Sequence, residues 1–145
     1  MCTVSLDDII VTSLQRIPTF GGNVLHALKK SDAGFNEFGE VYFSWIENCS
    51  IKAWKSHQRM TLNLVVPIGK VNFVFHSTKD DKNFRSENIG DDRYVRLTVP
   101  PGIWFGFQGR GKYRSLLMNL ADMAHDPDEV LRKTISEIDY NWSNQ

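Results

Sequence analysis

The chain has 145 residues, the size of one domain, and its 41% hydrophobic and 12% aromatic content supplies enough apolar material for one core. Lys and Arg together number 17, as do Asp and Glu, so the formal net charge is zero. This balance argues against duplex nucleic acid as a partner, because such binding relies on many cationic contacts to phosphates, but it leaves room for a small anionic ligand.

The start of the chain shows no basic segment followed by an apolar one, as a signal peptide would have. No run approaches the roughly 18 apolar residues of a membrane span. We therefore expect a cytoplasmic protein that does not bind membranes. Cys2 and Cys49 lack the spacing of a metal or redox motif and are expected to be free thiols.

Pro and Gly recur at short intervals, and the runs between them are rich in Val, Ile, Phe, Tyr and Thr, which predicts short β-strands. A solvated hairpin tip is expected at Lys79–Lys82. Many short strands between turn signals indicate an all-β sandwich or barrel, and we expect a single domain over residues 1–145. In chain order the predicted strands are Ile9–Leu14, Val24–Leu28, Val41–Ile46, Met60–Val66, Val71–His76, Tyr94–Val99, Ile103–Phe107 and Ser115–Ala121.

One short helix is predicted near the C-terminus, over Asp126–Lys133. Its first residue suits an N-cap and Pro127 suits the first helical position, with acids in the first turn and bases in the last. Beyond this helix, Tyr140 and Trp142 are expected to pack the tail back onto the barrel.

A polar stripe occupies every second position from Lys55 onward. Residues two apart on a strand share one face, so the stripe forms a row, whereas the alternate positions from Met60 to Val66 are apolar. A solvent-facing strand would give the same pattern. However, Lys, His and Arg in one row repel one another on a solvated sheet, which favours the wet, basic lumen of a barrel. The stripe consists of Lys55, His57, Arg59, Thr61 and Asn63.

Two motif spacings accompany the stripe. The places of the first cupin motif, His-x-His followed by Glu and Gly, are taken by Lys55, His57, Leu62 and Gly69. Those of the second, Pro-x-Gly followed by His, are taken by Pro100, Gly102 and Phe105. Over residues 30–130 the chain resembles the cupins, and among them the dTDP-4-dehydrorhamnose 3,5-epimerase and dTDP-sugar isomerase group. The resemblance implies a jelly-roll barrel, the double-stranded β-helix.

Metal ligands are missing from three of the four places in these motifs, which hold Lys55, Leu62 and Phe105. One His cannot hold a catalytic divalent metal, which needs about three or more protein ligands. The epimerases that the chain resembles are metal-free. We therefore expect neither a metal nor another cofactor.

The resemblance also implies roles for individual residues. In the family a basic residue three positions before the catalytic His helps to hold the substrate diphosphate, and Lys52 occupies that place here. Lys55 stands where the catalytic His would be. The family's acid is a Tyr on a late strand, and the matching stretch Leu116–Asn119 contains no Tyr.

Epimerisation beside a ketone needs a base that removes the adjacent proton and a group that stabilises the enolate. Lys55, desolvated in a basic lumen, would have a lowered pKa and can act as the base. Alternatively His57 is the base and Lys55 stabilises the enolate oxygen. Tyr42 is the candidate acid. Substrate contacts are expected from Lys52, Arg59, Thr61, Asn63 and Asn119.

Three functions remain open on these grounds. The first is a metal-independent epimerase or isomerase that acts on a dTDP-4-keto-6-deoxy sugar for polysaccharide biosynthesis. The second is a cupin that binds a sugar nucleotide or anionic sugar without turnover. The third is an assembly protein that uses the barrel face for a partner. A homodimer is expected, because related cupins pair through their sheets.

Overall fold

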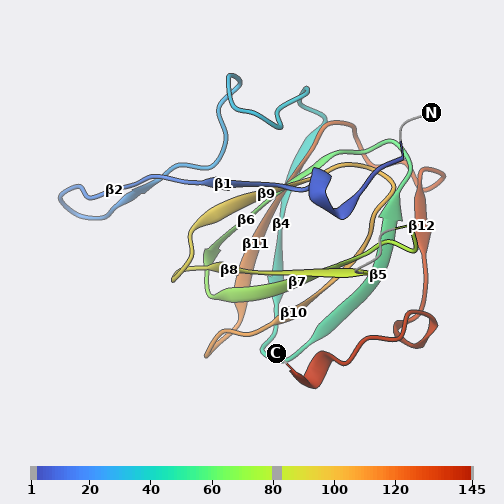
Figure 1. The fold of residues 1–145 in the computed structure, drawn as a ribbon. Coiled ribbons are helices and arrows are strands. Elements are labelled where there is room, and N and C mark those ends of the chain that lie inside the picture. Colours follow the sequence, from blue (N-terminus) through green and yellow to red (C-terminus); the bar gives the residue numbers. More distant parts are fainter. Residues whose placement is uncertain (1–2, 80–82, 145) are drawn as a thin grey trace.

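The computed structural model describes residues 3–79 and 83–144 and contains two five-stranded antiparallel sheets that pack face to face (Figure 1). The first sheet has the spatial order β1 (Ile10–Ser13), β9 (Val95–Val99), β6 (Leu62–Ile68), β11 (Ser115–Ala121) and β4 (Glu40–Ile46). The second has the order β12 (Val130–Arg132), β5 (Ile51–His57), β10 (Trp104–Gly109), β7 (Lys70–His76) and β8 (Phe84–Gly90). A small hairpin joins β2 (Arg16–Ile17) and β3 (Val24–Leu25), and 3-10 turns cover Leu6–Asp8, Ile135–Glu137 and Trp142–Asn144.

The core lies where the inward faces of the two sheets meet. Apolar side chains at every second position of β6 and β7 enter it, as period-two alternation requires. Burying each of them stabilises the fold by roughly 1.5–3 kcal/mol. The ring of Phe73 also meets that of Phe107, with centroids 5.3 Å apart. The inward residues of these two strands are Leu62, Leu64, Val66, Val71, Phe73 and Phe75.

The prediction of an all-β fold is confirmed, and each predicted strand overlaps an observed one. β8 was not predicted, because its Arg, Ser, Glu and Asn residues hide the apolar alternation. The predicted hairpin tip at Lys79–Lys82 lies in the connection between β7 and β8, where residues 80–82 fall outside the described part of the chain.

The sequence pattern predicted that the polar stripe follows one strand, but in the structure the stripe is divided between two strands. β5 ends at His57, the chain bends over residues 58–61, and β6 begins at Leu62. Alternation in the sequence continues through the bend and therefore conceals it. As a result, only the first part of the stripe belongs to the second sheet.

The prediction of a C-terminal helix over Asp126–Lys133 is wrong. Asp126 accepts hydrogen bonds from the N–H groups of Asp128 and Glu129, which closes a single turn. The chain then extends as β12 along the edge of β5, and Lys133 continues this pairing with backbone bonds to Trp54. These bonds protect a sheet edge that would otherwise stay open, and they outweigh the local helix signals.

The C-terminal tail packs onto the outer face of the second sheet, as predicted. Trp142 and Ile138 form a buried cluster with Trp54 and Val74, and Tyr140 packs against its edge. The rings of Trp54 and Trp142 lie 5.3 Å apart. Within the described ranges, no helix is long and apolar enough to cross a membrane.

Candidate active site

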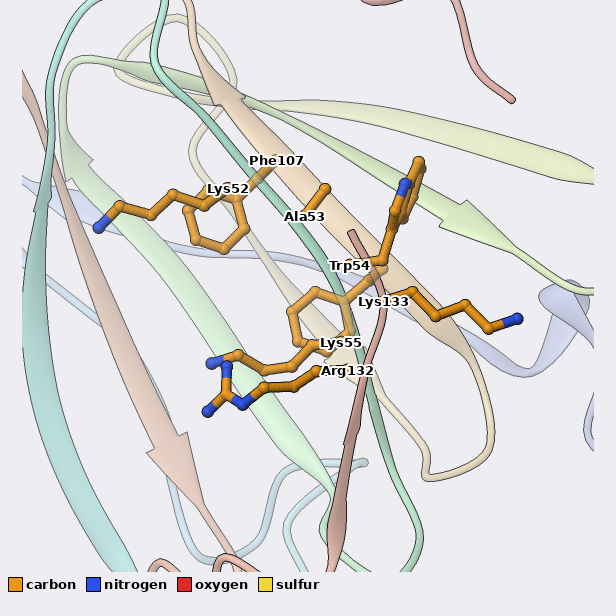
Figure 2. Close-up of a pocket in the computed structure, with 8 residues that line it drawn as sticks. Lys52, Ala53, Trp54, Lys55, Phe107, Arg132 and Lys133 are labelled. Carbon is orange, nitrogen blue, oxygen red and sulfur yellow. The ribbon is translucent and has the colours of Figure 1, made fainter. Parts of the chain in front are cut away.

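A β-bulge in β5 turns Lys52 and Lys55 toward the inside of the barrel. They stand opposite Phe107 and Phe105 of β10, respectively, with a one-residue register shift between the two pairs. Regular alternation would place the lysines on opposite faces, because they are three residues apart. The bulge instead places both beside phenyl rings that pack on the core. Trp54, between them, points away toward the tail (Figure 2).

Arg132 of β12 joins these lysines, because it stands directly opposite Lys55. Figure 2 shows the side chains of Lys52, Lys55 and Arg132 extending to the same side, away from Trp54. Together with the two phenylalanines of β10 they line a cavity of about 320 Å³. Among the described residues, none of these three cations forms an ion pair with a carboxylate.

The cationic cavity changes the protonation of Lys55. Burial lowers the pKa of Lys55 below its usual 10.5, and the charges of Arg132 and Lys52 lower it further. Arg132 keeps its proton, because a guanidinium does not deprotonate in proteins. Like charges gathered in a concave site without a counter-ion are costly unless a ligand brings negative charge. The cavity therefore suits an anionic ligand or a reaction that develops negative charge.

A second cavity, of about 340 Å³, adjoins the first, since Lys55 and Arg132 line both. It extends between β5 and β4 and adds an imidazole and a phenol to the cationic groups. Its remaining lining residues are Glu40, Tyr42, His57, Met60, His125 and Val130.

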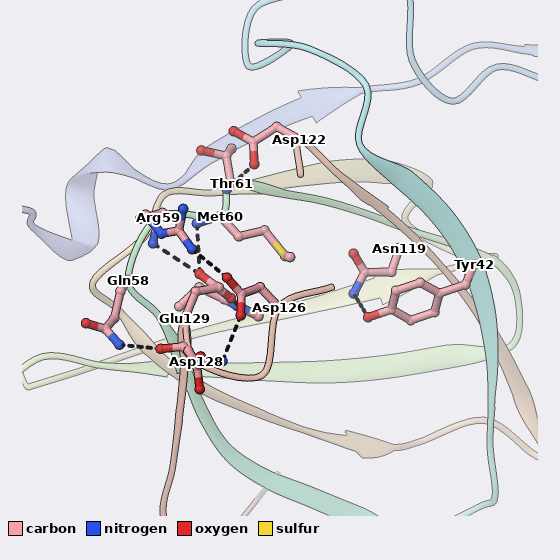
Figure 3. Close-up of polar contacts among 11 residues, drawn as sticks. Tyr42, Gln58, Arg59, Met60, Thr61, Asn119, Asp122, Asp126, Asp128 and Glu129 are labelled. Carbon is pink, nitrogen blue, oxygen red and sulfur yellow. Dashed lines mark hydrogen bonds and ion pairs between the residues drawn. The ribbon is translucent and has the colours of Figure 1, made fainter. Parts of the chain in front are cut away.

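His57 is held in this second cavity by a buried carboxylate. Its Nδ1 forms a hydrogen bond with Oε1 of Glu129, a residue that is only 2% exposed. Oε2 of Glu129 accepts hydrogen bonds from the backbone N–H groups of Arg59, at 3.1 Å, and Met60, at 3.2 Å (Figure 3). The bend after β5 thus wraps around the carboxylate.

These contacts set the charge of Glu129 and the orientation of the imidazole. Burial raises the pKa of Glu129, but the hydrogen bonds from His57 and from the two backbone N–H groups lower it below its ordinary value. Glu129 therefore stays ionised and fixes Nδ1 of His57 as the hydrogen-bond donor. Nε2 is left as the nitrogen that can take a proton from a ligand. This is the arrangement of a general base oriented by a carboxylate.

Tyr42 lies on β4, directly opposite Asn119 of β11 in the register. Nδ2 of Asn119 donates a hydrogen bond of 3.0 Å to the Tyr42 hydroxyl (Figure 3). Burial and the charge of Glu40 raise the pKa of Tyr42, so the phenol keeps its proton. Oδ1 of Asn119 is buried and has no hydrogen-bond partner within the described chain, which leaves an acceptor for a hydroxyl group of a ligand.

The other predicted site residues lie elsewhere. Arg59 is largely exposed and pairs with Asp126 at 2.9 Å. The backbone N–H of Thr61 donates to Asp122 at 2.9 Å. Asn63 lies on the outer face of the first sheet, where it contacts Arg96. Of the polar stripe, the structure brings only Lys55 and His57 into the cavities, and it adds Lys52, Tyr42 and Asn119 around them.

At the metal-ligand places of the cupin motifs, Leu62 and Phe105 are both part of the hydrophobic core. In the described ranges, no group of three or more His, Cys, Asp or Glu side chains is arranged to hold a metal ion. The cavities are lined by imidazole, amine, guanidinium and phenol groups together with the carboxylate of Glu40.

Sequence reasoning missed Glu129 and Arg132 as site residues. Both were assigned to the predicted helix, as an acid in its first turn and a base in its last. Glu129 is 72 positions from His57, so no local spacing could connect them. The only local signal was apolar Val130 and Leu131 between charged residues, which fits a short strand as well as a helix turn.

Comparison with known proteins places these features in a family, although no family model matches the chain. The chain is 32% identical to a dTDP-sugar isomerase from Desulfovibrio desulfuricans G20, with a TM-score of 0.87, and the match covers 96% of this chain and 93% of the other. It is 21% identical over 148 residues to the spore coat polysaccharide biosynthesis protein SpsL of Bacillus subtilis (strain 168), covering 97% of this chain and 98% of SpsL.

More distant structures share the fold. The 3,4-ketoisomerase QdtA from Thermoanaerobacterium thermosaccharolyticum, solved in complex with TDP, is 18% identical with a TM-score of 0.74, over 89% of this chain and 90% of the other. The dTDP-4-dehydrorhamnose 3,5-epimerase from Sulfolobus tokodaii is 17% identical with a TM-score of 0.78, over 95% and 83%. The chain belongs to the cupin-fold dTDP-sugar isomerase and epimerase group.

Proposed function

We propose that the protein is an epimerase or isomerase that acts on a dTDP-4-keto-6-deoxy sugar during the biosynthesis of a polysaccharide sugar, without a metal. The observation that carries this proposal is the His57–Glu129 pair beside Lys55 and Arg132 in one cavity. Family membership and the SpsL relative support the substrate class and the pathway.

In this mechanism Nε2 of His57 removes the proton from the carbon next to the sugar ketone. Glu129 stabilises the imidazolium that forms, because it stays ionised and bonded to Nδ1. The negative charge that develops on the ketone oxygen lies against Lys55 and Arg132. Returning the proton to the other face epimerises the carbon, and returning it to a neighbouring atom isomerises the sugar.

Lys52 and the Tyr42–Asn119 pair would hold the rest of the substrate. Lys52 is exposed on the cavity rim and suits a diphosphate oxygen. The unpartnered Oδ1 of Asn119 suits a sugar hydroxyl, and the protonated phenol of Tyr42 can donate to an oxygen or return a proton. Binding without turnover is the alternative function, since the same contacts would hold a nucleotide sugar if His57 were idle.

The test is solvent exchange. The protein is incubated with dTDP-4-keto-6-deoxyglucose in D₂O, and deuterium at C3 and C5 is followed by NMR. Catalytic exchange that is lost in His57→Asn and kept in His26→Asn, a His outside both cavities, supports the enzyme. Saturable thermal stabilisation by dTDP without exchange supports the binding protein instead.

We also propose that the protein forms a homodimer through the outer face of the first sheet. Phe43, at 60% exposure, and Trp45, at 44%, lie on one face of β4, and Ile68, at 49%, lies on β6, with β11 between the two strands. Aromatic side chains in such a patch favour a protein partner over solvent. Sedimentation velocity should show a dimer that Phe43→Ser converts to monomer. A monomer in the wild type at micromolar concentration would contradict the proposal.

A further inference from the structure

A purely electrostatic role does not explain why a lysine is found at position 55. Arg132, directly opposite it, already supplies a permanent positive charge to the same cavities. A second cation at this point adds repulsion, and no described carboxylate pairs with either residue. An amine that shares a cavity with a guanidinium loses its own proton first, because the guanidinium cannot.

The surroundings of Lys55 favour an uncharged, nucleophilic amine. Phe105 stands opposite it on the other side of β5, and burial together with Arg132 and Lys52 lowers its pKa. A lysine that is desolvated next to another cation is one of the known ways to activate an amine toward carbonyl groups. The substrate of the proposed function carries a ketone, so the inference below rests on that function.

The position of Lys55 relative to His57 also fits attack on this ketone. The two residues are two positions apart on β5 and both line the second cavity. Their Cα atoms are therefore about 6.6 Å apart along the strand. An extended lysine side chain is about as long as this separation. Nζ of Lys55 can therefore reach the ketone carbon of a bound sugar while the imidazole of His57 faces the carbon next to it. The ring of Phe105 stacks on His57, with centroids 6.1 Å apart, and packs beside both groups.

We propose that Nζ of Lys55 forms a covalent imine with the ketone of the sugar. The amine lone pair forms the C–N bond, the π pair of the carbonyl moves to oxygen, and a proton passes from the nitrogen to that oxygen, giving a neutral carbinolamine. Protonation of its hydroxyl from solvent releases one water and leaves an iminium ion. His57 then removes the adjacent C–H proton, and the electron pair of that bond gives a neutral enamine. Protonation at carbon and hydrolysis by water return the ketone and the free amine, so no oxidant or reductant is consumed.

Two variants separate covalent from electrostatic roles. Lys55→Arg keeps the positive charge but removes the nucleophilic amine, whereas Lys55→Met removes both. A covalent role predicts that both variants lose deuterium exchange by about 100-fold or more. An electrostatic role predicts that Lys55→Arg keeps most of the activity. Thermal melting curves confirm that each variant is folded.

Reductive trapping tests the imine directly. The protein is incubated with dTDP-4-keto-6-deoxyglucose and sodium cyanoborohydride, and its intact mass is measured before peptide mapping. We expect a mass gain equal to the substrate less one oxygen atom, located on Lys55. The adduct should be absent from Lys55→Arg, present in Lys112→Arg, which alters a remote exposed lysine, and retained in His57→Asn, which blocks only the later proton transfer.

A second measurement covers an imine that the reductant cannot reach. Each cycle of imine formation and hydrolysis replaces the ketone oxygen with an oxygen from water. In H₂¹⁸O, the wild-type protein should therefore speed up the incorporation of ¹⁸O into the ketone of the substrate. Deuterium exchange without an adduct and without catalysed ¹⁸O exchange would overturn the imine and leave the proposed function standing. Absence of deuterium exchange, adduct and ¹⁸O exchange alike would overturn both. An adduct on a different lysine would also overturn the assignment to Lys55.

Discussion

Cations in two regions of the barrel differ sharply in the partners that they have. On the outer face of the first sheet, Arg96 is fully buried and every nitrogen of its guanidinium donates a hydrogen bond. Its acceptors are Asn63 at 3.1 Å, Asp32 at 3.3 Å, and the carbonyls of Ala27, at 2.7 Å, and Ala33, at 3.1 Å. In the cavity, by contrast, Lys52, Lys55 and Arg132 have no described ion-pair partner.

The difference separates structural from functional charge. A buried charge whose donors are all satisfied fixes the surrounding chain, here residues 27–33, against the sheet. A group of charges without partners contributes little to the fold and keeps its interactions for a ligand. Changes around Arg96 should therefore alter stability, and changes in the cavity should alter activity.

The largest expected effect is on catalysis. His57→Asn should reduce the deuterium exchange rate by about 10³-fold, because the proposed general base is lost. The melting temperature should move by only a few degrees, since Asn can keep a hydrogen bond to Glu129. Exchange kinetics and calorimetry on the same preparation check both. Full exchange activity in this variant would place the base elsewhere.

Arg96→Met tests the structural side. It removes a buried cation that donates to the carbonyls of Ala27 and Ala33 and to the side chains of Asp32 and Asn63, so the free energy of unfolding should fall by about 3 kcal/mol. Urea denaturation measures this loss. Arg59→Met, which breaks an exposed pair with Asp126, is the matched control and should cost under about 1 kcal/mol. If the two variants lose equal stability, the comparison fails.

Glu129 contributes both to the fold and to the cavity, so its replacement should affect stability and exchange together. Glu129→Gln weakens its hold on His57 and should lower exchange by about 10–100-fold. It should also cost about 1–3 kcal/mol of stability, because the backbone N–H groups of Arg59 and Met60 lose a charged acceptor. Glu47→Gln, at an exposed site, is the control for both measurements.

The pH dependence of the same pair sharpens this result. The folded-state pKa of Glu129 lies below its unfolded value, so its contribution is present above the unfolded pKa and is lost as pH falls through the folded pKa. Wild type should lose stability faster than Glu129→Gln between about pH 5 and pH 3. If the stability of the two proteins falls in parallel over this range, the pKa of Glu129 is not lowered in the folded state.

The smallest effect concerns Lys55 and has the opposite sign. Lys55→Met relieves repulsion with Arg132 and Lys52 and should stabilise the protein by about 0.5–1 kcal/mol at neutral pH. Because the folded-state pKa lies below the unfolded value of 10.5, wild type regains stability as pH rises between the two. The advantage of Lys55→Met should thus shrink toward pH 10. A constant difference across this range would argue that the pKa of Lys55 is not lowered in the folded protein.

Local sequence patterns predicted the strands because burial alternates along them. The same rule failed at three places for identifiable reasons. Alternation cannot register the bulge that brings Lys52 to the face of Lys55. It also runs unbroken through the bend at residues 58–61, so Arg59, Thr61 and Asn63 seemed to extend the row.

The third failure concerns residues 126–133. Pro127 and the flanking charges carry good helix signals, yet pairing with β5 decides the outcome, and that pairing is visible only once the sheet is assembled. The same reason hid Glu129 and Arg132 from the predicted site. Lys55, His57 and Tyr42 could be named because a motif spacing or a strand face marked them locally.

The pairing of β12 with β5 affects when the cavity is completed during folding. Glu129 and Arg132 reach the cavity only when β12 docks on β5, more than 70 residues earlier in the chain. During synthesis the residues of β5 leave the ribosome well before their partners, and contacts between distant segments form late. A nascent chain can therefore collapse around its core while the cavity still lacks its orienting carboxylate and its guanidinium. Completion of the cavity is therefore expected to be one of the last events of folding.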